Sequence, residues 1–411
     1  MTNCVWKTIE AQEYCYKVAD GTHDSPKRKE AGRPLITSKH IKGRAIDFET
    51  AYLISENDYN KINQRSKVDQ WDVLISMIGE YCGYCYVEPN QQVEYAVKNV
   101  GIFKTGDKTK AYWLYYYLNS PDGKEKLKSL RSGTSQPYIS LGALRTLPVV
   151  VPEMEEMKRI VDILSSIDEK IELNRQTAQT LEAIAQAIFK EWFVDFNFPG
   201  ATGEMQESEL GEIPKGWSVG KLFDTCRLVG GGTPKTSMNE YWENGTIPWI
   251  SAKDVTPNNG TFIIETEKKI TRLGLQKSSA KLLPSHATVI TARGTVGNYC
   301  MIPEPMAISQ SNYALVPIEE GNEYFLFYTV ASLVTELKQR SYGTVFDTIT
   351  TNSLADISII IPTRKIFQKF HLIIHPIFEN ILGHIQQTKT LTQLRGNLLP
   401  KLMKGEIQVQ N

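Results

Sequence analysis

The chain has 411 residues, and its 46 Lys and Arg residues balance 46 Asp and Glu residues, so its formal net charge is zero. The length suits two or three domains, and a hydrophobic content of 41% indicates a globular protein and excludes a disordered or collagen-like one. The charge balance argues against a protein that coats nucleic acid through bulk charge, although basic groups concentrated on one face would still allow DNA binding.

The sequence predicts neither a membrane span nor an export signal. It contains no run of about 18 apolar residues. Residues 1–16 lack a basic start followed by an apolar core. The six cysteines show no disulfide-framework spacing, which favours reduced thiols. We therefore expect a soluble, cytoplasmic protein.

The chain matches itself at about half of its length. Three pairs of segments agree in the same order, with offsets between 210 and 215 residues: 34–41 with 248–255, 72–79 with 287–294, and 147–152 with 357–362. A repeat unit of this size indicates a tandem duplication and not a solenoid of short repeats. The agreement is confined to short apolar strands and turn residues, which suggests that the two copies bind different targets.

Each copy is predicted to begin with a mixed α/β domain and to end in a long helix. Short apolar runs predict strands, and one helix is expected in each domain, over 112–130 and over 323–339. After Pro152 and Pro362 the apolar period changes from two to about three and a half, which predicts a helix. The expected order is a first domain over 1–152, a helix over 153–197, a linker rich in Gly, Pro and Glu over 198–212, a second domain over 213–362, and a second helix with a tail over 363–411.

Both long helices carry an apolar heptad seam. In the first helix no Gly or Pro interrupts the seam before Pro199, whereas in the second Arg395 falls within it and Pro376 is expected to kink the helix. At 1.5 Å per residue each helix would be roughly 50–60 Å long. The residues expected to pair the helices are Ile160, Leu164, Ile167, Ile171, Asn174, Leu181 and Ile188 in the first, and Ile374, Ile377, Ile381, His384 and Leu391 in the second.

We expect the two helices to pack against each other in antiparallel orientation, with the domains at opposite ends of a dumbbell. In this arrangement the midpoints of the helices meet, so Asn174 could face His384, and a polar pair of this kind fixes register at a cost in stability. Two alternatives stay open: each helix could pack only on its own domain, and Asn174 could be an ordinary solvated residue.

Several patterns suggest chemistry but are incomplete. Cys82 and Cys85 form a C-x-x-C pair without further metal ligands, so buried strand cysteines are favoured over a redox or zinc site. His371 and His375 are four residues apart but lack the Glu of a zinc-protease motif. Residues 230–235 lack the spacing of a phosphate-binding loop, and no methyltransferase tetrapeptide, dinucleotide-binding motif or nuclease cluster is found. Catalysis is therefore expected to reside in another protein.

The motifs of the chain resemble one family. Residues 181–196 and 210–217 look like the central conserved region of type I restriction-modification specificity subunits, and the resemblance extends over both copies. The other segments that resemble this family are 167–174, 231–235 and 248–254. The first copy departs from the pattern, because residues 21–27 read GTHDSPK where the second copy has GGTPK.

The resemblance implies a DNA sequence-recognition subunit with no catalytic residues and no metal. Two α/β target-recognition domains in a pseudo-two-fold tandem repeat would each recognise one half of a split double-stranded DNA sequence. Two long antiparallel coiled-coil helices would set the spacing and dock two methyltransferase subunits. Restriction subunits would join this core, and S-adenosylmethionine, ATP and magnesium would serve the partners.

Candidate DNA contacts are basic and polar residues near strand ends and turns. Lys and Arg would contact phosphates, and side chains on loops would contact base edges. The candidates are Lys27, Arg28, Lys39, His40, Arg131, Ser135 and Gln136 in the first copy, and Lys235, Lys253, Arg272, Arg293, Thr344 and Phe346 in the second.

Two other classes of function remain possible from the sequence. The chain could be a stand-alone DNA-modifying enzyme with an unrecognised active site, or a coiled-coil scaffold that does not bind DNA. Under the favoured hypothesis the zero net charge is a sum over basic-faced domains, mixed-charge helices and an acidic linker. It then predicts modest intrinsic DNA affinity, with much of the phosphate contact supplied by partners.

Overall fold

The computed structural model describes residues 6–133, 135–340 and 348–407. The fold divides into a first unit, residues 1–170 with 391–411, and a second unit, residues 171–390. Each unit combines one globular α/β domain with a part of both long helices. The unit boundaries thus fall within the helices and not at the predicted domain ends. None of the described helices is long and apolar enough to cross a membrane.

The first domain is built around a buried four-stranded antiparallel sheet. Its central strand β5 (Asp72–Ser76) is buried along its whole length. Val73 and Ile75 face the helices of the domain, whereas Leu74 between them faces a small second sheet. The strand therefore alternates between two apolar layers, as the period of a strand requires. The strand order is β2 (Lys17–Asp20), β8 (Val100–Lys104), β5 and β6 (Cys85–Val87).

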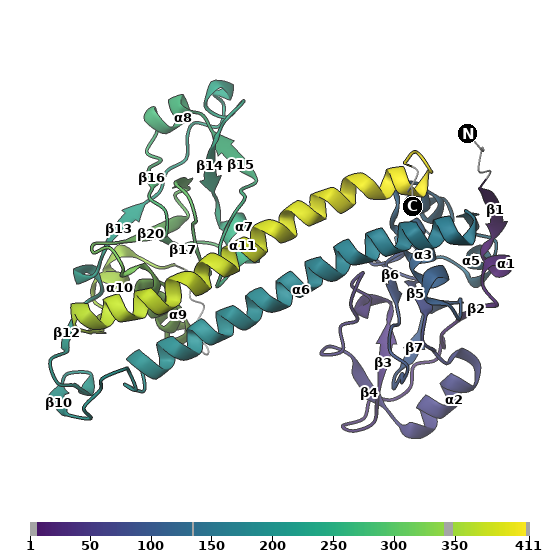
Figure 1. Ribbon diagram of the computed structural model, residues 1–411, viewed down its shortest axis with the longest axis horizontal. Helices are drawn as coiled ribbons and strands as arrows, with labels where there is room; N and C mark the ends of the chain where they lie inside the picture. Colours follow the sequence, from purple (N-terminus) through teal and green to yellow (C-terminus); the bar gives the residue numbers. More distant parts are fainter. Residues whose placement is uncertain (1–5, 134, 341–347, 408–411) are drawn as a thin grey trace. The chain divides into compact units, whose positions relative to one another are not determined.

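The small sheet of the first domain has three strands in the order β4 (Tyr52–Ile54), β3 (Arg33–Thr37) and β7 (Ala96–Lys98). Strand β3 pairs with β4 in antiparallel and with β7 in parallel orientation. Helix α2 (Glu56–Ser66) lies beside this sheet (Figure 1). Its Ile62 packs on Leu35, Ile54 and Ala96 of the strands. A third pairing joins β1 (Lys7–Glu10), followed by α1 (Ala11–Tyr14), to β9 (Pro148–Val151), directly before the first long helix.

The helix predicted over 112–130 is two helices in the structure. Helix α3 (Lys108–Asn119) is followed by Ser120, and α4 (Pro121–Ser129) starts directly after it. Pro121 has no N–H to donate and disfavours helical backbone at the residue before it, and Ser120 is accordingly extended, with ψ 161°. The Ser120 hydroxyl then accepts a hydrogen bond from the Gly123 amide and caps α4. The turn α5 (Leu141–Arg145) completes the domain.

The second domain repeats the topology of the first. The strand pair β12 (Ser218–Lys221) and β21 (Ser358–Ile361) has the register of β1 and β9. The buried sheet has the order β13 (Cys226–Gly230), β20 (Asn312–Pro317), β17 (Thr288–Thr291) and β18 (Tyr299–Met301). The small sheet has the order β15 (Lys268–Ile270), β14 (Ile247–Ile250), β19 (Met306–Ile308) and an additional strand β16 (Leu282–Leu283).

Short helices connect the strands of the second domain, and one longer helix packs on its buried sheet. The longer helix, α9 (Glu323–Arg340), lies where a helix was predicted over 323–339. The short elements are η2 (Leu222–Asp224), η3 (Asn239–Tyr241), α7 (Ala252–Val255), η4 (Thr256–Asn258), α8 (Arg272–Gln276) and α10 (Thr351–Ala355). The first domain has the corresponding short helix η1 (Ser38–His40) after β3.

The segment predicted to be a linker contains a β-hairpin. Strands β10 (Met205–Ser208) and β11 (Gly211–Pro214) form a hairpin there. Phe198 stacks on Trp217 with ring centroids 5.0 Å apart, and Ile213 is buried in the core of the second unit. The composition suggested a linker because the Gly and Glu residues of this segment lie at exposed positions. The aromatic residues that pack on each other, Phe198 and Trp217, lie at the start of the segment and just beyond its end.

Each of the two long helices has 40 residues, which corresponds to about 60 Å. They are α6 (Met154–Phe193) and α11 (Arg364–Met403), and α11 continues through Pro376. In the first unit the start of α6 packs with the end of α11, through Leu164 and Leu402 among others. In the second unit the end of α6 packs with the start of α11. The helices therefore run antiparallel within each unit (Figure 1).

The helix seams contact both the other helix and the domain of the same copy. In the first unit Ile160 and Leu164 share a cluster with residues of α3. In the second unit Phe370 and Ile374 share a cluster with residues of α9. The helices thus pack both on each other and on the domain of their own copy, and Asn174 is buried and not solvated. Of the predicted seam residues, Ile160, Leu164, Ile167, Ile171, Asn174, Ile374 and Ile381 are buried, and Leu181, Ile188, Ile377, His384 and Leu391 are half-buried.

The aromatic contact between the helices predicts a large loss of stability on truncation. Phe370 is fully buried, and its ring centroid lies 4.8 Å from that of Phe193 and 5.7 Å from that of Trp192. Phe370→Ala should lower the free energy of unfolding by about 3–5 kcal/mol, because it removes these contacts and leaves a cavity. Leu372→Ala, at a side chain that is 73% exposed, should change it by less than about 0.5 kcal/mol. Chemical denaturation would measure both, and equal losses would contradict this assignment.

Candidate nucleic-acid interface

The repeated motif of the two copies forms the same turn at the end of a small-sheet strand. In the first copy the Thr37 amide donates to His40 Nδ1 over 2.9 Å. In the second copy the Ser251 amide donates to Asp254 Oδ2 over 2.8 Å. Both acceptors satisfy an amide that the turn would otherwise leave unpaired. The motif is therefore structural at these positions, and the residue before each acceptor, Lys39 or Lys253, is exposed.

His40 was predicted to contact DNA, and this prediction is wrong. The side chain is fully buried, and its Nδ1 accepts the hydrogen bond that closes the turn. Burial lowers the pKa of His40 below 6.5, and the positive charge of Lys39 lowers it further. The imidazole is therefore neutral near pH 7. Its Nε2 atom is buried without a hydrogen-bond partner, so it does not reach a ligand at the surface.

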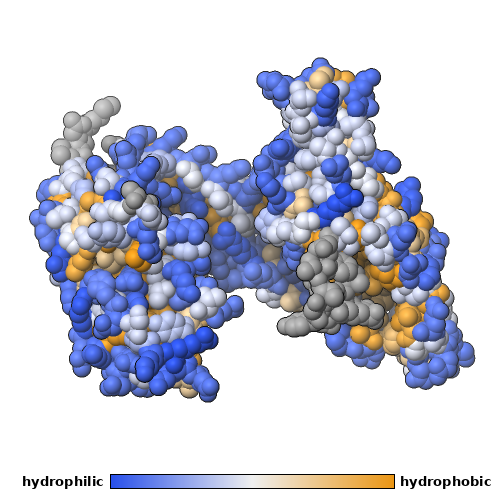
Figure 2. Space-filling view, turned by 180° about the vertical axis from the view of Figure 1, so that it is seen from behind, coloured by the Kyte–Doolittle hydropathy of each residue, from blue (hydrophilic) through white to orange (hydrophobic). Residues whose placement is uncertain are grey.

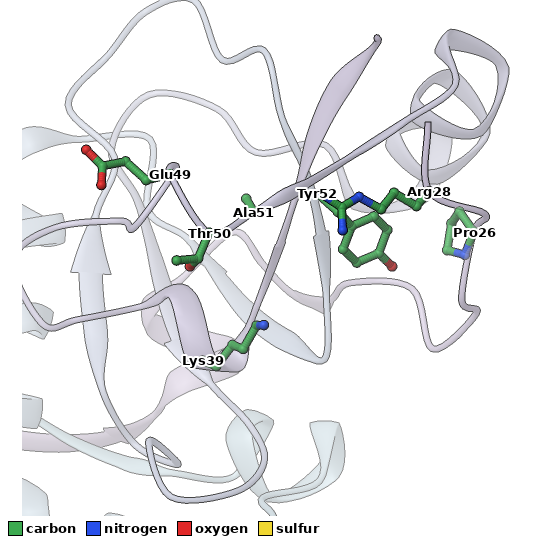
Figure 3. Close-up of a pocket in the computed structure, with 7 residues that line it drawn as sticks. All are labelled: Pro26, Arg28, Lys39, Glu49, Thr50, Ala51 and Tyr52. Atoms are coloured by element: carbon green, nitrogen blue, oxygen red, sulfur yellow. The ribbon is translucent and has the colours of Figure 1, made fainter. Parts of the chain in front are cut away.

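Two predicted DNA contacts, Arg28 and Lys39, line one hollow on the small sheet of the first domain. Lys39 extends towards the hollow from η1, while Arg28 and Tyr52 lie together beside it (Figure 3). The hollow has a volume of about 390 Å³, and Pro26, Glu49, Thr50 and Ala51 complete its lining. A second hollow along the same strand includes Arg28, Lys29 and Tyr52. The site thus presents cationic donors beside an aromatic ring, which suits contacts to phosphates and bases.

The first domain has a polar face. On the face shown in Figure 2, the part of the first domain that carries α2, β3 and β4 is predominantly hydrophilic. Lys27 is exposed beside the hollow. Glu30 and Glu49 lie among the cations, so the interface is not uniformly basic. Tyr52 and Lys29 were not predicted from the sequence, because a strand tyrosine and a loop lysine carry no distinguishing pattern.

Three further candidates of the first copy lie on a different turn. Ser132 and Tyr138 exchange backbone hydrogen bonds and close the turn that carries Ser135 and Gln136, both of which are exposed. Arg131 donates through Nη2 to the Cys82 carbonyl, so part of its hydrogen-bonding capacity is used to hold this turn. The structure does not place these residues in the hollow with Lys39.

In the second domain the basic candidates fall into two groups. Near η3, the Lys235 carbonyl accepts a hydrogen bond from the Trp242 indole, and Lys268 lies over the Trp242 ring at 5.7 Å. Arg272, at the start of α8, is exposed near the same segment, since the neighbouring Thr271 amide donates to the Tyr241 carbonyl. Lys253 and Arg293 are exposed at other strand ends. Thr344 and Phe346 lie outside the described residues.

The other chemical candidates have structural explanations. Cys82 and Cys85 are buried, and burial raises the pKa of both thiols, which therefore stay protonated. His375 Nδ1 lies 2.7 Å from the Tyr324 hydroxyl, and the His371 ring lies 3.1 Å from Glu323. Across the described ranges, no group of three His, Cys, Asp or Glu side chains could hold a metal ion.

Comparison with known proteins identifies the family. The family described as "Type I restriction modification DNA specificity domain" matches residues 17–183 and, a second time, residues 214–393. The chain belongs to this family. The two matches agree with the predicted tandem of two domains, and the resemblance drawn from the sequence is confirmed.

Relatives of this specificity-subunit family span most of the chain. The type I restriction enzyme HindI specificity subunit of Haemophilus influenzae is 29% identical, covering 72% of this chain and 77% of that protein. The MjaIX specificity subunit of Methanocaldococcus jannaschii is also 29% identical, covering 72% and 69%. The crystal structure of the type I restriction-modification S subunit from M. genitalium shares the fold, with a TM-score of 0.64 over 98% of this chain and 97% of that chain at 15% identity.

Membership defines the role of the chain at the level of the family. Type I specificity subunits recognise DNA sequence and are not catalytic, and the catalytic activity of these systems lies in partner subunits. The chain is therefore a DNA sequence-recognition protein.

The buried His40 predicts a dependence of stability on pH. Because its folded pKa is lowered, its contribution to stability is fully present above about pH 6.5 and is lost as the pH falls through the folded pKa. Asn at this position could accept the Thr37 amide without titrating. Between about pH 7.5 and about pH 5.5, His40→Asn should therefore lose less stability than the wild type. Thermal unfolding at several pH values measures this, and parallel curves for the two proteins would disprove it.

Proposed function

We propose that this specificity subunit recognises a split DNA sequence, with each domain contacting one half. The proposal rests on one observation: the two domains have the same fold but carry different residues at equivalent surface positions. Strand pairing aligns Leu35 with Tyr52 in the first copy and Trp249 with Lys268 in the second. The same strand position thus presents an aromatic ring in one domain and a cation in the other. Such a difference would give the two domains different base preferences.

We further propose that the paired helices set the number of base pairs between the two half-sites. Both helices are continuous over 40 residues. Within the second unit, Asn174 Oδ1 lies 3.1 Å from His384 Nδ1, and Asn174 Nδ2 donates to Gln387 Oε1 over 2.8 Å. Asn174 is fully buried. A shift of one helix along the other would leave this amide unsatisfied, so the contact favours one register.

The partners follow from the same proposal. Two methyltransferase subunits would dock on the helices, and restriction subunits would join them in the full complex. S-adenosylmethionine would supply the methyl group in the methyltransferases, and ATP and magnesium would serve the restriction subunits. The complex would act on cytoplasmic DNA.

Mapping methylated bases in DNA treated with the assembled complex tests the recognition proposal. A split motif with a gap of constant length is expected, because two separate domains contact it. A short continuous motif would contradict recognition by two domains. The purified chain alone should not methylate DNA, and methylation by it would support a stand-alone enzyme instead.

Substitutions around the first hollow should weaken DNA binding by the complex. Lys39→Ala should lower affinity for all sequences and reduce the slope of log affinity against log salt by about one, because it removes one phosphate contact. Arg28→Ala, if Arg28 contacts a base, should cost about 1–3 kcal/mol and relax the preference at one position. Lys7→Ala, at an exposed lysine on β1, is the control. Mobility shifts over a range of salt measure these effects, and equal behaviour of Lys39→Ala and the control would remove Lys39 from the interface.

A further inference from the structure

The connection between β3 and β4 in the first domain is joined by an ion pair to the long helix of the same copy. This connection, residues 41–51, starts beside Lys39 and ends beside Tyr52, so both of its ends belong to the hollow. From its middle, Arg44 Nη1 reaches the carboxylate Oδ1 of Asp168 on α6 over 2.5 Å. The connection also contacts its own domain, because Lys42 lies over the Tyr81 ring at 4.0 Å and the ring of Phe48 lies 5.6 Å from that of Tyr95. Arg44 adds a contact to the long helix.

Asp168 is fully buried, and every partner of its carboxylate is a donor. Oδ1 also accepts from Arg395 Nη1 on α11 over 2.7 Å, and Oδ2 accepts from the Tyr116 hydroxyl on α3 over 2.8 Å. Burial raises the pKa of Tyr116, and the negative charge of Asp168 raises it further, so the phenol stays protonated as a donor. A buried carboxylate is tolerated only with such partners. Arg395, which interrupts the seam in the sequence, is therefore explained by Asp168.

The second copy has an ion pair at the same place in the topology, with the charges reversed. In the connection between β14 and β15, Glu265 Oε1 lies 2.6 Å from Lys389 Nζ on α11. Glu265 is 62% exposed and Lys389 34% exposed, so solvent weakens this pair. The two copies thus join the same connection to their own helix through unrelated residues, and only the first pair is buried at its helix end.

We propose that Arg44 is a positioning residue for DNA recognition by the first domain. Its ion pair with Asp168 holds the connection between β3 and β4, and thereby places Lys39 and Tyr52 at the interface. The inference rests on the proposed function of the first hollow. Removing Arg44 leaves Asp168 with Arg395 and Tyr116, so the buried charge keeps its counterion. The connection loses its contact with α6, while the packing of the helices is retained.

The test uses the full chain assembled with its methyltransferase subunits. Arg44→Met removes the ion pair and keeps much of the side-chain length. Glu265→Gln removes the exposed pair of the second copy and is the matched control, and Arg395→Met removes the other arginine of Asp168. Methylation is measured on the mapped target and on targets with one base pair changed at each position, and thermal unfolding is measured on the same proteins.

Arg44→Met should lower the preference for the mapped target over a target with one changed base pair by about tenfold, which is the size of the preference that one base pair provides. This loss should be confined to positions in one half of the target. Glu265→Gln should leave discrimination in both halves unchanged. Arg395→Met should lower the thermal midpoint with discrimination retained. If Arg44 were merely structural, its replacement would lower the thermal midpoint without relaxing discrimination.

Two results would overturn the inference. One is unchanged discrimination by Arg44→Met with only a lower thermal midpoint, and the other is equal relaxation in both halves. If Arg44→Met does not fold, Arg44→Gln removes the charge and keeps a polar side chain, and it must relax the same positions for the inference to stand. If the wild-type complex methylates no split target, the proposed function itself fails, and that outcome is distinct from the other two.

Discussion

Two helices of 40 residues cannot bury their apolar seams alone, and the rest of the structure depends on how they are covered. In each unit one face of the helix pair packs on the domain helix, α3 or α9, and the two helices cover each other. The domains are therefore held to the helices by apolar contacts of the same kind as those that hold the helices together. Polar groups within these contacts include Asn174 and His384, which form a hydrogen bond with each other.

The two copies solve the same packing problem with different chemistry. In the first unit Asp168 pairs with Arg395 across the helices. At the equivalent positions, 210 residues away, the second unit has Phe378 and Ala185, which are buried in one aromatic cluster. The charges of the helices also differ: α6 has eight acidic and five basic residues, whereas α11 has one acidic and six basic. The expectation of two mixed-charge helices is therefore wrong for α11, and opposite net charges favour the pairing.

Much of the fold was predictable because it depends on local periodicity. The heptad seams and the repeated motifs led to the duplication, the long helices and the contact between Asn174 and His384. The candidate interface was predictable only in part. Lys39 is exposed as expected, but His40 beside it is buried, because the same turn directs adjacent side chains in opposite directions. Tyr52 and Arg44 carry no pattern along the chain, so their roles could not be predicted.

The sequence by itself determined the class of the protein and its two-copy organisation, since apolar period and internal similarity are properties of the chain. Only the tertiary structure decided which polar residues are exposed at the surface and which are buried with a polar partner. Arg395 illustrates the difference, because along the chain it interrupts a seam and in the fold it neutralises a carboxylate 227 residues away. A charged group is tolerated inside a protein when its partner is present, and that partner is brought close by folding.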